Sequence, residues 1–352
     1  MKNPPAPRST SDSSFATAQH FGPILDLIRQ SRRRALQAVN AALVDLHWGI
    51  GRYLSGKIRE EGWGQGTVRD LAAWLQSREP GLRGFSAQNL WRTRQFFETY
   101  KDDEELSPLV RELPWTHNII IINKCTSREE RGFYLKMASR ERWAKRDLER
   151  QIDGALFERV LTGRPKLSPP LRELRPEAAT LFKDSYLVDF LDLPENHSEK
   201  DLQRGLVQHL KDFLLELGRD FCFVGSDYLI QVGGVDFHLD LLCFHRGLRA
   251  LVAFELKIGG FEPGHLGQLS FYLEALDRDH RKPHEAPSIG VLLCKDRNAD
   301  VVEYSLSRTL SPALVADYQT QLPDKGLLRA KLEEFYELAA REAMGEYRKS
   351  GS

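Results

Sequence analysis

The stretch FHLDLLCFHRGLRALVAFELK, residues 237–257, decides the fold of the C-terminal half of the chain. Two runs rich in aliphatic and aromatic residues flank the turn sequence His-Arg-Gly-Leu at 245–248, and this pattern predicts a β-hairpin. A turn centred between the glycine and the leucine pairs residues whose numbers sum to 495. In that register Asp240 faces Glu255, so the hairpin is expected to bring two carboxylates together.

Two carboxylates that face each other on an apolar strand pair repel, and partial desolvation adds to the cost. A divalent cation neutralises them, because Mg²⁺ takes hard oxygen ligands, usually one or two carboxylates with waters and substrate phosphate. Lys257 follows Glu255 by two residues and projects from the same strand face. This arrangement suits phosphodiester hydrolysis, in which a metal activates water and a lysine stabilises the transition state. The alternative is an ordinary strand end, since Glu-Leu-Lys alone is a weak motif.

The segments around the hairpin alternate helices and strands, as expected for an α/β domain. Leucines recur on one face of a predicted helix at 198–217, between the N-capping Ser198 and Gly218. Strands are predicted at 221–224, 227–232, 237–244, 248–256 and 288–294, with a further helix at 264–277.

Three stretches within residues 198–310 are similar to a known family: FLLELGRDFCFVG, HLDLLCFHRGLRALVAFELKIGGFEPGHLGQLSFYL and GVLLCKDRNADVVEYSL. They resemble the C-terminal nuclease domain of the YhcG-like PD-(D/E)XK proteins. The resemblance implies a restriction-endonuclease-like α/β fold, in which helices flank a mixed central sheet. It also implies that Asp240, Glu255 and Lys257 form the catalytic core, with Mg²⁺ or Mn²⁺ held by the two carboxylates.

The same resemblance implies roles for three further residues. Gln268 and Tyr272 form a Q-x-x-x-Y pair, which many nucleases of this class place beside the active site, and one helix face presents both. The alternative is that Gln268 only makes hydrogen bonds within the fold and that Tyr272 packs on the sheet. Glu199 resembles an acidic residue that other members of the superfamily bring to the metal, and its alternative is a solvated carboxylate at a helix N-terminus.

Two positions depart from the family pattern. Gln203 stands where a second acidic residue is expected in the first helix of the domain. The sequence GSDYLI, residues 225–230, replaces an Arg-Gln-Tyr run before the second strand. Substrate contacts at these two positions are therefore not carried over from the family.

The first 160 residues are predicted to be mostly helical. Apolar residues recur at helical spacing between about 21 and 100, interrupted by the glycine-rich EEGWGQG at 60–66. Two more helices are predicted at 127–141 and 143–160. The stretches VNAALVDLHWGIGRYL, GWGQGTVRDLAAWL, GFSAQNLWRTRQFFETY and LPWTHNIIIINK resemble the helical domain that precedes the nuclease domain in the same family.

A helix that begins after the turn sequence PGLRGF forms, with the helix before it, a pattern typical of a helix-turn-helix. From the major groove, such a helix reaches phosphates or base edges with its polar side chains. The candidate nucleic-acid-binding residues are Ser86, Gln88, Asn89, Arg92 and Arg94. The alternative is that this aromatic-rich helix is a packing element.

Composition and proline content predict the domain organisation. Four prolines fall within residues 161–180, where little periodicity is seen, so a linker is expected there. The predicted organisation is a disordered N-terminus at 1–19, a helical domain at 20–160, this linker, and a nuclease domain at 181–345.

The net charge of zero hides an asymmetry between the two halves of the chain. Residues 1–165 carry 27 Lys and Arg against 20 Asp and Glu, so the basic half is the more plausible site of attraction to phosphates. The alternative is that the helical surface is highly charged and is basic by chance, without a role in binding.

The four cysteines are widely separated and contain no C-x-x-C pair, which argues against a zinc site or a disulfide framework. Neither a run of about 18 apolar residues nor a signal peptide is visible. We therefore expect a cytoplasmic protein with no membrane partner, and the sequence leaves a homo-oligomer open.

The function predicted from these observations is that of a Mg²⁺-dependent endonuclease whose favoured partner and substrate is DNA. Two alternatives stay open at this point. The nuclease fold could serve as a non-catalytic nucleic-acid-binding scaffold, or the same catalytic core could act on RNA, because the phosphodiester chemistry begins alike.

Overall fold

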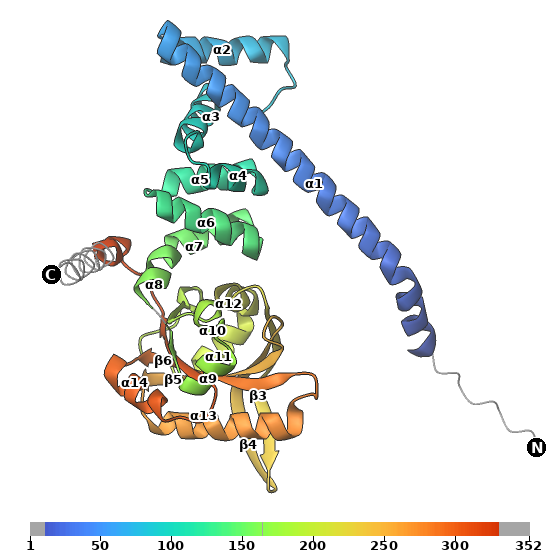
Figure 1. Cartoon of the computed structure of the whole chain (residues 1–352), viewed down its shortest axis with the longest axis vertical. Helices are drawn as coiled ribbons and strands as arrows, with labels where there is room; N and C mark the ends of the chain where they lie inside the picture. The colour runs from blue at the N-terminus through green and yellow to red at the C-terminus, as the bar shows by residue number, and fades with distance from the viewer. Residues whose placement is uncertain (1–10, 164, 331–352) are drawn as a thin grey trace, which may run out of the picture. The chain divides into compact units, whose positions relative to one another are not determined.

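The structure is a computed structural model that describes residues 11–163 and 165–330, without the side chains of 11–22 and 33. It divides into two compact units, Met1–Lys145 and Arg146–Ser352 (Figure 1). No helix in the described part of the chain is both long enough and apolar enough to cross a lipid bilayer.

The first unit is helical, as predicted. The glycine-rich segment at 60–66 separates its first two helices, and Ser86 caps the third by accepting a hydrogen bond from the Asn89 backbone N–H at 3.3 Å. The elements are α1 (Ser11–Glu61), α2 (Gln65–Arg78), α3 (Ala87–Tyr100), α4 (Leu106–Leu109), the short 3₁₀ helix η1 (Val110–Glu112), α5 (Trp115–Lys124) and α6 (Arg128–Glu141).

The prediction of disorder at 1–19 needs correction. Residues 1–10 lie outside the described part of the chain, but residues 11–19 belong to α1. The polar composition suggested disorder, yet the segment SDSSFATAQH at 11–20 contains neither proline nor glycine. Gly22 and Pro23 follow this segment, and α1 continues through both, although a proline within a helix removes one backbone hydrogen bond.

The second unit contains a mixed sheet flanked by helices, which confirms the predicted fold class. Its helices are α7 (Lys145–Asp153), α8 (Leu156–Thr162), α9 (Pro169–Leu174), α10 (Ala178–Leu181), η2 (Asp189–Leu191), α11 (Glu199–Gln208), α12 (Leu210–Leu217), α13 (Gly264–Ala275), η3 (Leu276–His280) and α14 (Ala299–Ser307). Its strands are β1 (Lys166–Leu167), β2 (Ser185–Leu187), β3 (Phe221–Val232), β4 (Val235–His245), β5 (Ala250–Gly260), β6 (Ala286–Asp296) and β7 (Ala313–Gln319).

The seven described strands form one sheet in the order β1-β7-β6-β5-β4-β3, and β2 pairs with β7 off this path. Strands β3, β4 and β5 are antiparallel neighbours, whereas β5, β6 and β7 run parallel. Strand β5 therefore lies between the two halves of the sheet, with β4 on one side and β6 on the other. A residue on β5 is consequently surrounded by backbone on both sides.

Two buried cores cover the two faces of the sheet. Leu202 and Leu206 of α11 and Phe213 of α12 belong to the core on one face. Leu269 of α13 and Val302 of α14 belong to the core on the other face. The central strands present apolar side chains on both faces of the sheet. Helices must therefore cover each face, which gives three layers.

The segment 161–180 is not an open linker in this structure. It includes β1, which pairs antiparallel with β7, and the helices α9 and α10. Leu167, Leu171 and Ala178 are all at most 3% exposed and belong to a core of the second unit. Ser168 caps α9, and two of the four prolines that suggested a linker, Pro169 and Pro170, stand at the start of this helix, where proline is well tolerated.

Candidate active site

The β4–β5 hairpin has the predicted register, since Leu241 pairs with Phe254 and His245 with Ala250. The paired run ends at Leu241 and Phe254, one step before Asp240 and Glu255. Beyond this point an Asp240 carboxylate oxygen, Oδ2, accepts a hydrogen bond from the Leu256 backbone N–H at 2.8 Å. The two acidic residues therefore meet where the strands separate, and the Asp240 side chain bridges the gap.

Glu255 is held inside the sheet and is only 3% exposed. Burial and, after it, the nearby Asp240 carboxylate raise the pKa of its carboxyl group to about 7, against the opposing effect of Lys257. Burial also raises the pKa of Asp240 above its usual range. Each carboxylate is thus costly to ionise in this place unless a positive charge accompanies it.

Lys257 supplies part of that positive charge. Its Nζ donates a hydrogen bond to Glu255 Oε1 at 2.9 Å and lies 3.9 Å from Glu199 Oε2. Burial by itself would lower the pKa of Lys257, but the hydrogen bond to Glu255 and the surrounding carboxylates raise it overall. The lysine is therefore a fixed cation within the acidic cluster.

The residues present fit a divalent cation, because one carboxylate oxygen is left without a partner. Glu255 Oε2 is buried and accepts no hydrogen bond within the described residues. A buried acceptor of this kind is rare in folded proteins, and a metal ion is one established explanation. No set of three or more His, Cys, Asp or Glu side chains in the described ranges is arranged to hold a metal. Two carboxylates are nevertheless within the usual number for Mg²⁺, which keeps several waters.

Glu199 stands at the first position of α11, after the capping box formed by Ser198 and Asp201. Its carboxylate is 43% exposed and is within electrostatic range of Lys257, Asp240 and Glu255. The structure thus brings Glu199 to the site, as an outer charge near the lysine.

The Gln268–Tyr272 pair also reaches the site. Gln268 Nε2 donates to Tyr272 Oη at 3.0 Å, and that hydroxyl donates to the backbone carbonyl of His238 at 3.2 Å. Burial raises the pKa of Tyr272, and Asp240 and Glu255 act on it in the same direction. The pair therefore ties α13 to β4 two residues before Asp240, while Gln268 remains exposed.

Two residues that were not predicted as site residues also lie around Asp240. Gln203, noted only as a departure from the family pattern, donates from Nε2 to the Asp240 backbone carbonyl at 2.9 Å. Asp227 on β3 has a positive φ of 49° and acts electrostatically on Asp240, and its Oδ1 lies 3.1 Å from His238 Nδ1. An aspartate in a left-handed conformation inside a strand is unusual, and the sequence signal for it was the altered GSDYLI run.

The candidate nucleic-acid-binding residues at α3 differ in the contacts that their side chains make within the first unit. The Ser86 hydroxyl accepts the capping hydrogen bond from the Asn89 backbone N–H. The Asn89 side chain donates to the Gly84 carbonyl, so both side chains are already engaged. Arg94 pairs with Glu98 at 2.8 Å. Gln88 is exposed and Arg92 is half-buried, and neither side chain has a hydrogen bond or ion pair with another described residue. These two are the side chains of the set that remain available to a ligand.

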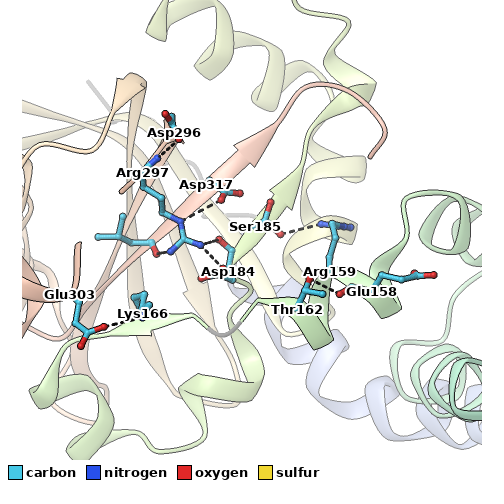
Figure 2. A network of polar contacts seen from close by, with 11 residues as sticks. Glu158, Arg159, Thr162, Lys166, Asp184, Ser185, Asp296, Arg297, Glu303 and Asp317 are labelled. Carbon is cyan, nitrogen blue, oxygen red and sulfur yellow. Dashed lines mark hydrogen bonds and ion pairs between the residues drawn. The ribbon is translucent and has the colours of Figure 1, made fainter. Parts of the chain in front are cut away.

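A second polar network lies elsewhere in the same unit and has a structural role (Figure 2). Arg297, which follows β6, is paired with Asp184 and lies 3.4 Å from Asp317 Oδ2. The guanidinium also donates to the backbone carbonyls of Val315 and Asp184. Arg297 follows β6 and has partners on β7 and at Asp184, directly before β2. The network therefore connects these three strands at one end of the sheet.

Comparisons with known proteins find matches for both halves of the chain. Residues 179–333 match a family model described as the YhcG PDDEXK nuclease domain, and residues 23–159 match the DUF1016 N-terminal domain. A protein of Escherichia coli (strain K12) named as the nuclease YhcG is 30% identical over 347 residues, which cover 88% of this chain and 92% of that protein. A repair endonuclease from Pyrococcus abyssi aligns over 37% of this chain and 49% of its own, with 11% identity and a TM-score of 0.24, too low to support an argument.

Proposed function

The chain belongs to the YhcG family of PDDEXK nucleases, and from that premise we propose that it is a divalent-metal-dependent endonuclease acting on DNA. The observation that carries the proposal is the unpartnered, buried Glu255 Oε2 beside Asp240 and Lys257. Asp240 and Glu255 would hold Mg²⁺ or Mn²⁺. When bound, the cation supplies positive charge for the scissile phosphate and lowers the pKa of a coordinated water.

The side chains of the protein have separate tasks in this proposal. Lys257 has three N–H donors, of which one is directed to Glu255, so the others are available to the attacking water or to a phosphate oxygen. The Leu256 backbone N–H and Gln203 orient Asp240 through its carboxylate and its backbone carbonyl. Tyr272 fixes the backbone of β4 through His238. Positioning by a rigid strand pair is the contribution that such catalysis needs.

The helical unit is proposed to bind the nucleic acid. Residues 1–165 carry the excess of basic residues, and the available side chains of α3, Gln88 and Arg92, are of types that contact phosphates and base edges. DNA is the favoured substrate because a helix of this kind fits the major groove of B-form DNA, whereas the major groove of duplex RNA is too narrow.

A cleavage assay with matched substrates tests the proposed function. The full chain is incubated with linear, supercoiled, single-stranded and four-way-junction DNA and with RNA duplexes of the same sequence, each with Mg²⁺, Mn²⁺ or EDTA. We expect metal-dependent cleavage of at least one DNA form and none with EDTA. Cleavage of RNA alone would identify RNA, and not DNA, as the substrate. Binding without cleavage under every condition would favour the non-catalytic scaffold.

Replacing Arg92 with alanine is expected to weaken DNA binding about 10-fold and to lower the slope of log affinity against log salt by about one, because one phosphate contact is lost. The control is Arg69→Ala, which removes the same charge from an exposed position on α2. Fluorescence anisotropy at several salt concentrations measures both quantities. Equal losses for the two variants would show diffuse attraction instead of docking through α3.

A further inference from the structure

Helix α13 brings one more polar side chain to the edge of the candidate site. His265 lies in the first turn of this helix and is half-buried. It precedes Tyr272 by seven residues, which is close to two full turns, so the two side chains share one helix face. Tyr272 contacts β4 through the backbone carbonyl of His238. The same face therefore carries His265 along the site, roughly 10 Å from Tyr272 at 1.5 Å of rise per residue.

The charged groups around His265 show on which side of the site it lies. Lys257 and Glu199 both act electrostatically on its ring. The charged atoms of these two residues are 3.9 Å apart, so they mark one side of the cluster. Tyr272, two turns further along the helix, is within range of the two carboxylates that would hold the cation. The His265 ring thus lies on the Lys257 side of the site, at the beginning of α13.

One hydrogen bond determines which ring nitrogen of His265 carries the proton. The Glu262 backbone N–H donates to His265 Nδ1 at 3.2 Å. Nδ1 is therefore an acceptor, and in a neutral imidazole the other nitrogen, Nε2, is then the N–H donor. Nε2 has no hydrogen-bond partner among the described residues. His265 thus presents one available N–H donor on a ring that the backbone holds in place.

The same hydrogen bond opposes protonation of the ring. An imidazolium carries a proton on Nδ1, and that proton would face the Glu262 N–H. Burial lowers the pKa of His265, and Lys257 acts in the same direction against the smaller effects of Glu262 and Glu199. The side chain is consequently a neutral donor at neutral pH. It can direct a hydrogen bond to an anionic oxygen, but it does not supply a positive charge.

We propose that His265 binds the substrate by donating from Nε2–H to a non-bridging oxygen of the phosphate next to the scissile one. The inference rests on the proposed function, because it assigns a further contact of the same site. In that function Lys257 and the two carboxylates surround the scissile phosphate. A donor on the outer side of Lys257 therefore meets the neighbouring phosphate of the same strand. Such a contact contributes to binding and to the register of the strand.

Two substitutions separate the roles of the two ring nitrogens. Asparagine places an amide oxygen close to the position of Nδ1, so His265→Asn keeps an acceptor for the Glu262 N–H and loses the donor. Glutamine extends an amide N–H toward the position of Nε2, so His265→Gln keeps the donor. The control is His284→Asn, which removes an exposed histidine just before β6, at the end of the sheet remote from Lys257.

Steady-state kinetics with Mg²⁺ test the contact on the DNA form that the wild type cleaves. For His265→Asn we expect KM to rise about 10-fold with kcat unchanged, because a contact equal in the ground and transition states affects binding alone. His265→Gln should recover most of this loss, and His284→Asn should match the wild type. Thermal melting checks that all variants are folded. If His265→Asn kept the wild-type KM, or if both substitutions at this position raised it equally, the inference would be overturned while the nuclease assignment stood.

Neutral methylphosphonates at single positions of the DNA identify the phosphate that His265 contacts. At the phosphate next to the scissile one, this replacement should lower kcat/KM about 10-fold more for the wild type than for His265→Asn, which has already lost the hydrogen bond. At more distant phosphates the two proteins should lose equally. Equal losses at every position would overturn the proposal. A wild type that cleaves no nucleic acid would instead refute the proposed function, and this inference would fall with it.

Discussion

Replacing Lys257 with alanine is expected to lower the rate of DNA cleavage about 100- to 1000-fold while the protein stays folded and still binds metal. The reason is that its ammonium group acts on the attacking water or the transition state, and losses of this size accompany removal of one such donor. The Asp240→Asn variant should differ, since it keeps an acceptor for the Leu256 N–H but loses a ligand charge.

The two variants are compared in single-turnover cleavage at saturating protein, with metal affinity measured separately. Lys295→Ala is the control, because this exposed lysine follows Cys294, the residue that pairs with Lys257 on the adjacent strand, and contacts only the Glu195 carbonyl among described residues. We expect Lys257→Ala to lose turnover with metal affinity retained, and Asp240→Asn to lose both. If Lys257→Ala cleaved DNA at the wild-type rate, the lysine would not belong to the catalytic core.

Replacing Glu216 with alanine is expected to destabilise the second unit by about 3–5 kcal/mol, which is the usual effect of breaking a buried ion pair. Glu216 is 1% exposed, and its Oε1 lies 3.0 Å from both Arg159 Nη1 and Lys183 Nζ. It also accepts from the Leu187 N–H at 3.0 Å. Arg159, which additionally donates to the Ser185 carbonyl (Figure 2), would be left buried without its counter-charge.

The same cluster predicts a pH dependence. Burial alone would raise the pKa of Glu216, but Lys183 and Arg159 outweigh it and lower the pKa to about 2. The ion pairs therefore contribute their full stability above the ordinary glutamate pKa of about 4.3, and this contribution is lost as the pH falls toward 2. Urea unfolding at pH 7, 4 and 3 should show the gap between wild type and Glu216→Gln shrinking with acid. A gap that is independent of pH would contradict the assigned ion pairs.

Much of the candidate site could be predicted from the sequence because it depends on strand periodicity and a short turn. The register that places Asp240 beside Glu255 follows from the turn at 245–248, and the observed pairing of Leu241 with Phe254 confirms it. The contact between the Asp240 side chain and the Leu256 N–H could not be predicted, since it depends on where the strands separate. Likewise, no spacing rule connects Gln203 on α11 with the Asp240 carbonyl.

The domain boundary shows the limit of composition as a guide. Prolines at 161–180 suggested a linker, yet two of them begin α9, and Leu171 is fully buried. Proline removes a backbone donor and fixes φ, and the first turn of a helix tolerates both effects. The distinction depends on whether apolar residues between the prolines find a core, and that is a property of the folded chain.

Calorimetric titration of Mn²⁺ into the metal-free protein tests the central claim most directly, because it asks whether Asp240 and Glu255 hold a cation without relying on a substrate. The account predicts one bound ion per chain for the wild type and for Lys257→Ala, and none at the same concentrations for Asp240→Asn or Glu255→Gln. Circular dichroism confirms that each variant is folded. Binding of Mn²⁺ to Asp240→Asn and Glu255→Gln with wild-type affinity would contradict the claim that these carboxylates form the metal site.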